Sequence, residues 1–350
     1  MRAVVYHGRR DVRVEDVPEP GPLGDGQVRL RVVRAALCGT DAAEYAHGPT
    51  LLPLNHPHPG SGHRGPTIIG HEFVGEVEAV GAAVEHLTVG QRVVPGAGVW
   101  CGRCALCRAG RPNLCTSYYT LGINADGGMT ERINVPAAMC APVPDECSDD
   151  AAAIAQPLAV ALHAVRRANV QRDELALLIG VGGIGFFLLA GLLARGARVI
   201  AVDVDPEKLA AAARQGAAHT VDASAEDVVE RVTDLGGPVD VALEASGAAP
   251  SPALAQRLVR TGGRVVLVGL QREPRAIDLA DLVLREVDVV TSNAHVCAVD
   301  LPEALTLLAI RRLSADAVDR VVGFDAVVAE GLEPLAAGDV SGKVLVDPWA

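Results

Sequence analysis

The dipeptide His71-Glu72 places two metal-binding side chains next to each other, with Gly70 before it and Gly75 after it. A neutral imidazole nitrogen and a carboxylate oxygen are both good ligands for a borderline metal such as zinc. The dipeptide alone carries little weight, because most such pairs occur by chance on protein surfaces. Its interest comes from the rest of the chain, beginning with the thiol of Cys38 upstream.

A second group of ligands is local. Cys101, Cys104, Cys107 and Cys115 fall within fifteen residues, among glycine, arginine and proline. Tight Cys-x2-Cys turns present thiolates that converge tetrahedrally on one zinc. Because the protein would fill all four positions, we expect a structural zinc here. Disulfides are the alternative. The sequence opens on a strand pattern without the apolar segment of a secretory signal, which favours a reducing, cytoplasmic setting and metal binding.

A glycine-rich turn predicts a dinucleotide site. It comprises Gly180, Gly182, Gly183, Ile184 and Gly185, and it lies between an apolar strand pattern and an apolar helix pattern. Such glycines let a pyrophosphate approach the backbone, and the following helix directs its N-terminus at the charge.

An acidic residue supports this site and predicts which cofactor it takes. Asp203 ends the next predicted strand, 18 residues after Gly185. There it can bind the adenosine ribose hydroxyls and repel a 2′-phosphate, which predicts NAD rather than NADP. Further contacts with the cofactor are expected after later strands, from Ser246, Gly269, Leu270 and Asn293.

The order of the elements predicts two domains. At 350 residues the chain is long for one hydrophobic core. Residues 1–35 are expected to be β-rich, because 11–17 and 27–33 alternate polar and apolar positions, and residues 149–168 are alanine-rich and helical. From residue 173 onward strands alternate with helices, which implies a parallel sheet. Its last strand is expected within 283–290, and the tail at 343–348 is expected to add a strand back to the first domain.

Charge argues against two classes of partner, and the glycine pattern argues against a membrane-spanning helix. The net charge of −12 argues against nucleic acid and against an anionic membrane. Residues 175–194 form an uncharged run long enough to span a bilayer. The glycines within that run favour a strand, a turn and a helix instead.

Taken in order, these motifs resemble the zinc-dependent medium-chain dehydrogenase/reductase family over essentially the whole chain. The start at 11–18, the loop rich in His and Pro before His71 and the segment 157–165 are most similar to the butanediol and sorbitol dehydrogenase branch. The resemblance implies an α/β architecture with two domains. A GroES-like β-rich catalytic domain would span 1–155, completed by 297–350. A Rossmann domain with a doubly wound parallel sheet would span 156–296.

The resemblance also implies roles for residues. Cys38 and His71 would bind a catalytic zinc, Glu72 would bind it directly or through water, and Gln156 stands at a further ligand position. Thr40 would hydrogen-bond the substrate hydroxyl and begin the exit of its proton.

Asp41 would orient His71, and the four clustered cysteines would hold a structural zinc. The implied cofactors are two zinc ions per chain and NAD. The implied reaction is the reversible oxidation of a secondary alcohol, diol, polyol or cyclitol to a ketone, by a homodimer or homotetramer. Zinc would polarise the bound alcohol and lower its pKa.

Two positions depart from this branch. Gln156 stands where its enzymes usually carry Glu, so we hypothesise a more electron-withdrawing metal and a lower alcohol pKa. Ala43 stands where many relatives carry a histidine that passes the proton to solvent. Glu44, His47 or water through Thr40 are the candidate replacements.

Two alternative functions stay open. One is a biosynthetic reductase or glucose-type dehydrogenase with an altered proton relay. The other is a non-catalytic protein built on the cysteine cluster. The histidines at 47, 56, 58 and 63 are interpreted as a solvated or substrate-lining loop. Cys140, Cys147 and Cys297 are interpreted as packing residues.

Overall fold

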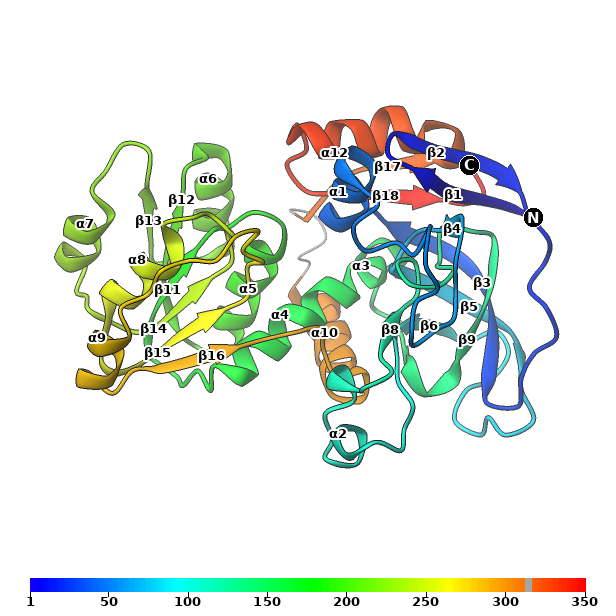
Figure 1. The fold of residues 1–350 in the computed structure, drawn as a ribbon, viewed down its shortest axis with the longest axis horizontal. Coiled ribbons are helices and arrows are strands. Elements are labelled where there is room, and N and C mark those ends of the chain that lie inside the picture. The colour runs from blue at the N-terminus through cyan, green and yellow to red at the C-terminus, as the bar shows by residue number, and fades with distance from the viewer. Residues whose placement is uncertain (312–316) are drawn as a thin grey trace. The chain divides into compact units, whose positions relative to one another are not determined.

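The computed structural model describes residues 1–311 and 317–350, which form two compact units. The first unit comprises Met1–Ala159 and His295–Ala350, and the second comprises Val160–Ala294 (Figure 1). The sequence had predicted boundaries at 155/156 and 296/297. Helix α4 (Ala155–Arg167) contains the first of the observed boundaries.

The first unit is built mainly from β-strands. A three-stranded sheet has the order β2-β1-β4, and a seven-stranded sheet has the order β10-β6-β5-β3-β18-β17, with β9 also paired to β3. Strands β7 and β8 form a separate pair. The strands are β1 (Arg2–Gly8), β2 (Asp11–Asp16), β3 (Gln27–Ala36), β4 (Thr67–Ile68), β5 (Glu72–Val80), β6 (Arg92–Pro95), β7 (Gly98–Val99), β8 (Tyr119–Thr120), β9 (Arg132–Pro136), β10 (Cys140–Pro142), β17 (Val318–Gly323) and β18 (Lys343–Asp347).

Short helices connect and cover these strands. They are α1 (Gly39–His47), α2 (Ala105–Arg108), η1 (Pro112–Leu114), η2 (Ala137–Met139), α3 (Asp149–Ala153), α10 (Cys297–Arg311), η3 (Phe324–Ala326), η4 (Val327–Leu332) and α12 (Glu333–Ala337). The tail strand β18 joins the first unit, as the sequence predicted, and it pairs with both β17 and β3.

The second unit is a parallel six-stranded sheet with the order β13-β12-β11-β14-β15-β16. Its central strand β11 is buried along its whole length, as expected for a strand covered on both faces. Because the chain has few aromatic residues, the core is aliphatic, with Leu177, Ile200, Val221 and Val265 among its members. Strands and helices alternate: β11 (Leu175–Ile179), α5 (Gly183–Ala194), β12 (Arg198–Asp203), α6 (Pro206–Gln215), β13 (His219–Asp222), α7 (Val228–Asp234), β14 (Val239–Glu244), α8 (Ser251–Leu258), β15 (Val259–Leu267), α9 (Leu279–Leu284) and β16 (Asp288–Thr291).

The prediction of one strand within 283–290 was partly wrong. The strand β16 begins only at Asp288, and Val283 and Leu284 end helix α9. Apolar residues in a short run do not separate a helix from a strand, since both periods fit them. The uncharged run at 175–194 is β11, the glycine turn and α5. Within 1–311 and 317–350, no helix is both long and apolar enough to cross a membrane.

Candidate functional site

Three neighbouring strands bring the predicted metal ligands of the first unit to one end of the seven-stranded sheet. Ala36, the last residue of β3, lies opposite Glu72, the first residue of β5. Ala36 also lies opposite Leu345 of β18, so the start of that strand reaches the same edge. Cys38 lies two residues after the end of β3 and is the N-cap residue of α1. Antiparallel pairing therefore gathers residues that are far apart in sequence.

Cys38, His71 and Glu72 form one cluster of possible metal ligands, with one donor atom of each within 4.8 Å of the others. His71 and Glu72 are buried, at 6% and 1% exposed. Gly70 adopts φ +95°, and a Cβ there would lie 2.6 Å from Cγ of Met129, so the turn that presents His71 requires glycine. A thiol, an imidazole and a carboxylate in a dry site fit a catalytic zinc with room for a further ligand.

Lys343 completes the charge pattern of this cluster, and sequence reasoning missed it. Its Nζ lies 2.6 Å from each carboxylate oxygen of Glu72 and 3.3 Å from the carbonyl oxygen of Leu37. The Lys343 side chain is only 12% exposed. Glu72 is thus an ion-pair partner as well as a possible metal ligand, and the cluster contains one more positive charge than was expected.

The buried charges shift one another. Burial raises the pKa of the Cys38 thiol, but the charges of Lys343 and His71 outweigh it and lower this pKa to about 6. Burial lowers the pKa of His71, but Asp41 and Cys38 raise it to about 10. The cluster therefore favours the thiolate, which is the form of cysteine that binds metals.

The residues next to the cluster are ordered by helix α1. Asp41 accepts a hydrogen bond from the backbone N of Cys38 at 2.8 Å. Its Oδ1 lies 3.7 Å from Nδ1 of His71, which is an ion-pair distance and too long for a hydrogen bond. The hydroxyl of Thr40 lies 3.7 Å from Sγ of Cys38, beside the predicted metal position.

The structure places one further predicted ligand and one candidate for the proton relay. Gln156 lies half-buried in the first turn of α4, and its role as a ligand stays a prediction. Glu44 is buried, and its carboxylate accepts hydrogen bonds from the backbone N of Thr50 at 2.9 Å, from the Thr50 hydroxyl and from the backbone N of Leu51 at 2.8 Å. These bonds hold the loop after α1, so Glu44 is unsuited to replace a proton relay at Ala43.

The four clustered cysteines converge as well. The four Sγ atoms all lie within 4.8 Å of one another, those of Cys101, Cys104, Cys107 and Cys115. Backbone N–H groups donate to these sulfurs, from Cys101 and Ser117 to Cys115 and from Cys107 to Cys104. Hydrogen bonds from the backbone of Cys107 and Thr116 lower the pKa of Cys104 to about 6. All eight cysteines are free of disulfides. The loop that carries the four clustered cysteines, residues 101–115, is called the lobe below, and it fits a structural zinc.

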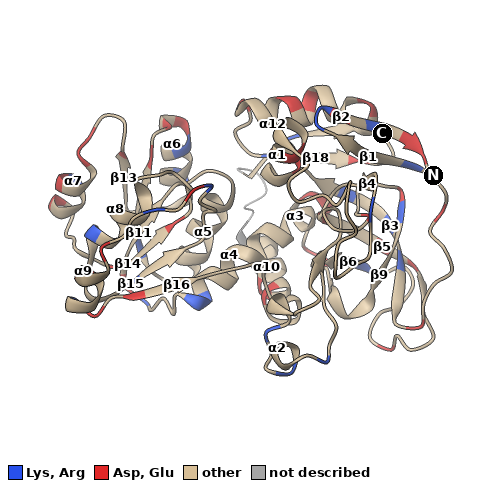
Figure 2. Cartoon of the chain, viewed as in Figure 1, with Lys and Arg blue, Asp and Glu red and all other residues tan. Residues whose placement is uncertain are grey.

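The lobe is polar and its surroundings are positively charged. Arg103, Arg108 and Arg111 are exposed around α2 (Figure 2). A zinc bound by four thiolates carries a net charge of minus two, and nearby guanidinium groups offset it.

The glycine turn of the second unit has the shape of a nucleotide site. Gly180 follows β11 with φ +89°, and Gly182 caps helix α5, whose N-terminus opens at the turn. Asp203, the last residue of β12, accepts a hydrogen bond from the backbone N of Val181 in that turn at 2.8 Å. Its other oxygen accepts one from Val204. The predicted acid is therefore held against the predicted turn.

The later strands place the other predicted cofactor residues. Ser246 follows β14, while Gly269 and Leu270 follow β15. The Ser246 hydroxyl already bonds to Glu244 at 2.7 Å and pairs with the Ser251 hydroxyl at 2.7 Å. Backbone atoms of this loop are therefore better placed than the hydroxyl to contact a cofactor. Leu270 is 89% exposed, and Asn293 is exposed after β16. The contacts of these residues with a cofactor stay predictions.

A signal for the missed cations was present in the composition. Of 31 basic residues only two, Lys208 and Lys343, are lysines, and the other 29 are arginines. Lys343 contacts the metal cluster. Lys208 lies near the glycine turn, with its Cε 3.7 Å from where a Cβ of Gly182 would be. The composite metal cluster and the glycine turn thus each have one of the two lysines in the chain.

Comparisons with known families cover both units. Residues 24–145 match the model of the alcohol dehydrogenase GroES-like domain, and residues 183–309 match that of the zinc-binding dehydrogenases. The chain is 32% identical over 355 residues to (R,R)-butanediol dehydrogenase of Neisseria gonorrhoeae, a match that covers 99% of each. It is 34% identical over 276 residues to sorbitol dehydrogenase of Bacillus subtilis, covering 77% of this chain and 75% of the relative.

Solved structures agree. A crystal structure of 2R,3R-butanediol dehydrogenase from Bacillus subtilis superposes with a TM-score of 0.91 at 32% identity, covering 99% of both chains. A zinc-binding dehydrogenase from Sinorhizobium meliloti, bound to NADP, superposes with a TM-score of 0.88 at 30% identity, again over 99% of both. Zinc and a nicotinamide cofactor are typical of such proteins. The chain therefore belongs to the zinc-binding alcohol dehydrogenases, a family of oxidoreductases with a GroES-like domain and a Rossmann domain.

Proposed function

We propose that the protein is a reversible NAD-dependent dehydrogenase that oxidises a secondary alcohol of a diol, polyol or cyclitol to a ketone. The observation that carries the proposal is the buried cluster of Cys38, His71 and Glu72. The same chain has a glycine turn that is hydrogen-bonded to Asp203. It would therefore hold both a Lewis acid and a hydride acceptor.

A zinc ion held by this cluster would supply Lewis-acid polarisation of the substrate oxygen. The chain's own residues supply the rest. Thr40 would accept the proton of the substrate hydroxyl while releasing its own hydroxyl proton, because its hydroxyl lies beside Cys38. With Glu44 committed to the backbone of Thr50 and Leu51, the proton would leave Thr40 through water. Lys343 would keep the Glu72 carboxylate in place and partly neutralised.

The choice of substrate and cofactor rests on relatives and on one side chain. The relatives include (R,R)-butanediol, sorbitol and L-idonate 5-dehydrogenases, whose names describe a diol, a polyol and a sugar acid. Although one structural relative binds NADP, Asp203 lies against the glycine turn, where its charge would repel a 2′-phosphate. Eight unpaired cysteines support a cytoplasmic setting.

A substrate panel tests this proposal. The purified protein would be assayed with NAD and with NADP against 2,3-butanediol stereoisomers, sorbitol, inositol, L-idonate, L-threonine and glucose, with reduction followed by absorbance. We expect a vicinal diol or polyol to give the highest kcat/KM with NAD, and metal analysis to give two zinc ions per chain. A preference for glucose would support the glucose-type alternative. One zinc per chain with no cofactor binding would refute the dehydrogenase.

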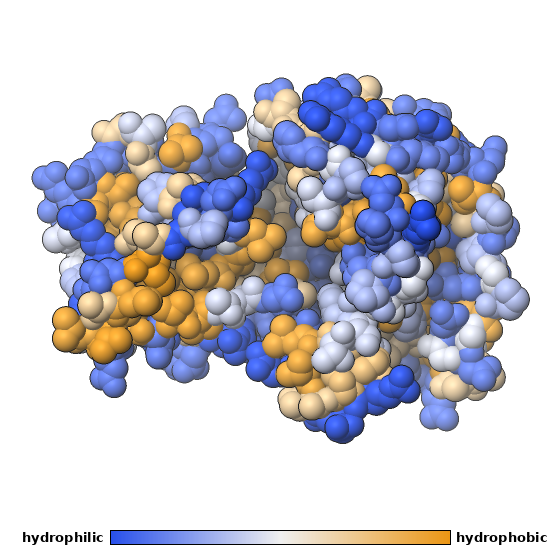
Figure 3. All heavy atoms as spheres, viewed as in Figure 1, coloured by the Kyte–Doolittle hydropathy of each residue, from blue (hydrophilic) through white to orange (hydrophobic). Residues whose placement is uncertain are grey.

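We also propose that two copies associate through the outer edge of the parallel sheet. Strand β16 ends that sheet in the described chain, so one side of its backbone is available for pairing. The exposed side chains nearby are apolar: Leu279 is 65% exposed, Val283 79%, Leu284 85% and Val289 43%. Figure 3 shows the orange patch at this part of the second unit.

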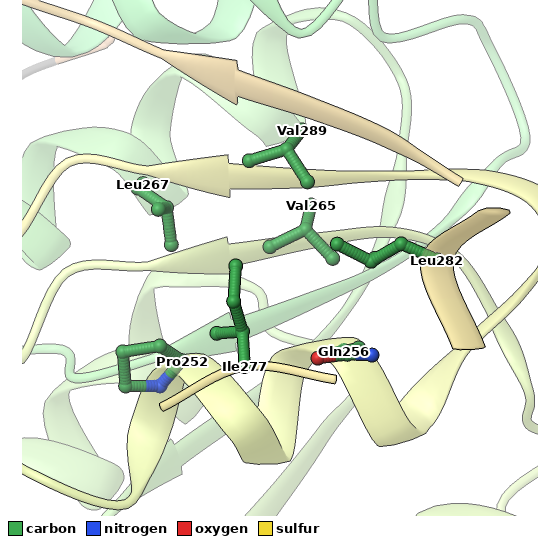
Figure 4. Close-up of a pocket in the computed structure, with 7 residues that line it drawn as sticks. All are labelled: Pro252, Gln256, Val265, Leu267, Ile277, Leu282 and Val289. Atoms are coloured by element: carbon green, nitrogen blue, oxygen red, sulfur yellow. The ribbon is translucent and has the colours of Figure 1, made fainter. Parts of the chain in front are cut away.

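The surface beneath that edge is not flat. Pro252, Gln256, Val265, Leu267, Ile277, Leu282 and Val289 line a small pocket between α8 and the outer strands (Figure 4). An edge strand can pair with itself antiparallel about a twofold axis, which suits a second copy. Val283→Glu together with Leu284→Glu should convert a dimer into a monomer in light scattering. A wild-type monomer, or an unchanged mass in the variant, would contradict this interface.

A further inference from the structure

Glu244, the last residue of β14, is fully buried and contacts two loops. Its Oε1 accepts hydrogen bonds from the backbone N of Ser246 and of Gly247, both at 2.8 Å, and from the Ser246 hydroxyl at 2.7 Å. Its Oε2 faces Gln271, whose Nε2 lies 3.4 Å away. One carboxylate therefore joins the loop after β14 to the loop after β15.

Around this carboxylate the backbone is packed without space for one more carbon. A Cβ on Gly269 would lie 2.6 Å from Oε2 of Glu244, and a Cβ on Gly180 would lie 2.7 Å from the N of Ser246. The backbone N of Val268 and of Gly269 each donate to the carbonyl oxygen of Glu244 at 2.9 Å. The loops after β11, β14 and β15 are thereby held in one arrangement.

The order of the strands indicates which half of a dinucleotide these loops would contact. The direction of chain progression reverses between β11 and β14, with β12 and β13 on one side and β15 and β16 on the other. A dinucleotide lies across such a switch point, with one nucleotide on each side. Asp203 ends β12, so the adenosine half falls on that side. The loops that Glu244 joins are left for the nicotinamide half.

We propose that Glu244 is a positioning residue for the nicotinamide half of the cofactor, an inference that rests on the proposed function. It need not contact the cofactor. Its carboxylate holds the backbone of Ser246 and Gly247 at a fixed distance from Gly269, so that the two loops form one rigid surface against which the nicotinamide half would bind. A carboxylate suits this task because it has only acceptor atoms for the donors around it, and hydrogen bonds to a charged acceptor are about twice as strong as neutral ones.

Two ligands separate this role from general stability. ADP occupies only the adenosine side, whereas NADH occupies both sides, so their dissociation constants report on different halves. We would measure NADH by its fluorescence and ADP by calorimetry, for wild type and for Glu244→Gln. The expected result is an NADH dissociation constant about tenfold weaker, a change of about 1.4 kcal/mol, with that of ADP within about twofold.

Asp240→Asn is the matched control. Asp240 lies near the other end of the same strand, where its carboxylate accepts the backbone N of Leu175 at 2.8 Å and a bond from Arg260 at 2.7 Å. This variant removes a similar charge from β14 away from the loops, and both ligands should bind it as they bind wild type. A selective loss of NADH binding in Asp240→Asn would overturn the assignment to Glu244.

The remaining outcomes also decide the question. Equal weakening of NADH and ADP in Glu244→Gln, or unchanged NADH binding, would overturn the proposal. If wild type binds neither ligand, the proposed function fails first and takes this inference with it. If Glu244→Gln does not fold, as judged by circular dichroism, Ser246→Ala provides the test. It removes the hydrogen bond from the Ser246 hydroxyl to Glu244, together with the contacts of that hydroxyl with Ser251 and the backbone N of Ala248. NADH alone should bind about threefold more weakly, and unchanged NADH binding would refute the role.

Discussion

The two metal-ligand clusters of the first unit are assembled in opposite ways. The four cysteines of the lobe lie within a short loop, and three of them are partly exposed. In the other cluster the residues come from α1, the start of β5 and the start of β18, and Glu72 and Lys343 lie 271 residues apart. The lobe holds its ligands by local turns, whereas the other cluster depends on the register of a whole sheet. A local cluster is suited to stability, and a buried composite one to chemistry.

The largest expected effect separates these roles. Cys38→Ala removes a buried ligand from the composite cluster, so kcat/KM should fall by about three orders of magnitude, since Lewis-acid polarisation contributes several kcal/mol. Metal analysis should show one zinc per chain instead of two, with an unchanged circular dichroism spectrum. Activity within tenfold of wild type would show that this cluster is not the catalytic one.

The matching change in the lobe should act on stability. Cys104→Ala breaks the four-thiolate site, so the thermal midpoint should fall by roughly 10 °C, because a structural metal contributes directly to folding free energy. At low temperature kcat/KM should change little. A Cys104→Ala variant with the thermal midpoint of wild type but without activity would contradict the assignment of stability to the lobe and catalysis to the other cluster.

Lys343→Met tests the ion pair of the composite cluster. It leaves the Glu72 carboxylate buried without its cation, which should destabilise the metal-free protein by about 3 kcal/mol in urea unfolding. Arg231→Met is the control, because Arg231 pairs with Glu226 where both side chains are more than a third exposed, and it should cost under about 1 kcal/mol. Adding Glu72→Gln to Lys343→Met should recover part of the loss. Equal losses in Lys343→Met and Arg231→Met would show that burial adds nothing to the Glu72 pair.

Amine labelling offers a milder probe of burial. The Lys208 side chain is 40% exposed and that of Lys343 is 12% exposed. Burial lowers the pKa of Lys343, but Glu72 and Cys38 outweigh it and raise it overall. A raised pKa keeps the amine protonated, so acylation of Lys343 should need a higher pH than that of Lys208. Peptide mass spectrometry would follow both sites, and bound NAD should protect Lys208 alone. Faster labelling of Lys343 at neutral pH would contradict its burial beside Glu72.

The smallest expected effect concerns Gln156. If its amide faces the metal, Gln156→Glu adds a negative charge there and should raise the apparent pKa of the pH–rate profile by about one unit. Gln156→Met keeps the length without the charge and serves as the comparison. A profile that does not move in Gln156→Glu would show that the amide has no electronic role.

Sequence reasoning reached what is encoded locally. The cysteine spacing, the glycine turn with Asp203 and the tail strand are each contained in short segments, and the structure gathers them as their patterns indicate. Lys343 escaped because its place beside Glu72 depends on the pairing of β18 with β3 and of β3 with β5. No spacing rule contains that register.

Other misses have related physical causes. The last strand of the parallel sheet was expected within 283–290, a run that mixes apolar and charged residues, yet Val283 and Leu284 are exposed at the end of α9. Burial of Glu244 could not be read from its neighbours, since its partners are backbone groups of the loop after β14 and the side chain of Gln271 in the loop after β15. The rarity of lysine was readable, because only two of 31 basic residues carry an ammonium group.

The position of Lys343 also has a consequence for biosynthesis. A ribosome makes this residue 271 residues after Glu72, so the nascent catalytic unit already holds its thiol, imidazole and carboxylate while the compensating cation is still untranslated. Until β18 is released and inserted beside β3, the Glu72 carboxylate lacks its cation and can bind a divalent ion instead. Metal selection during synthesis can therefore differ from metal selection by the finished protein. Translation-coupled loading in defined metal mixtures, compared with refolding in the same mixtures, would reveal that difference.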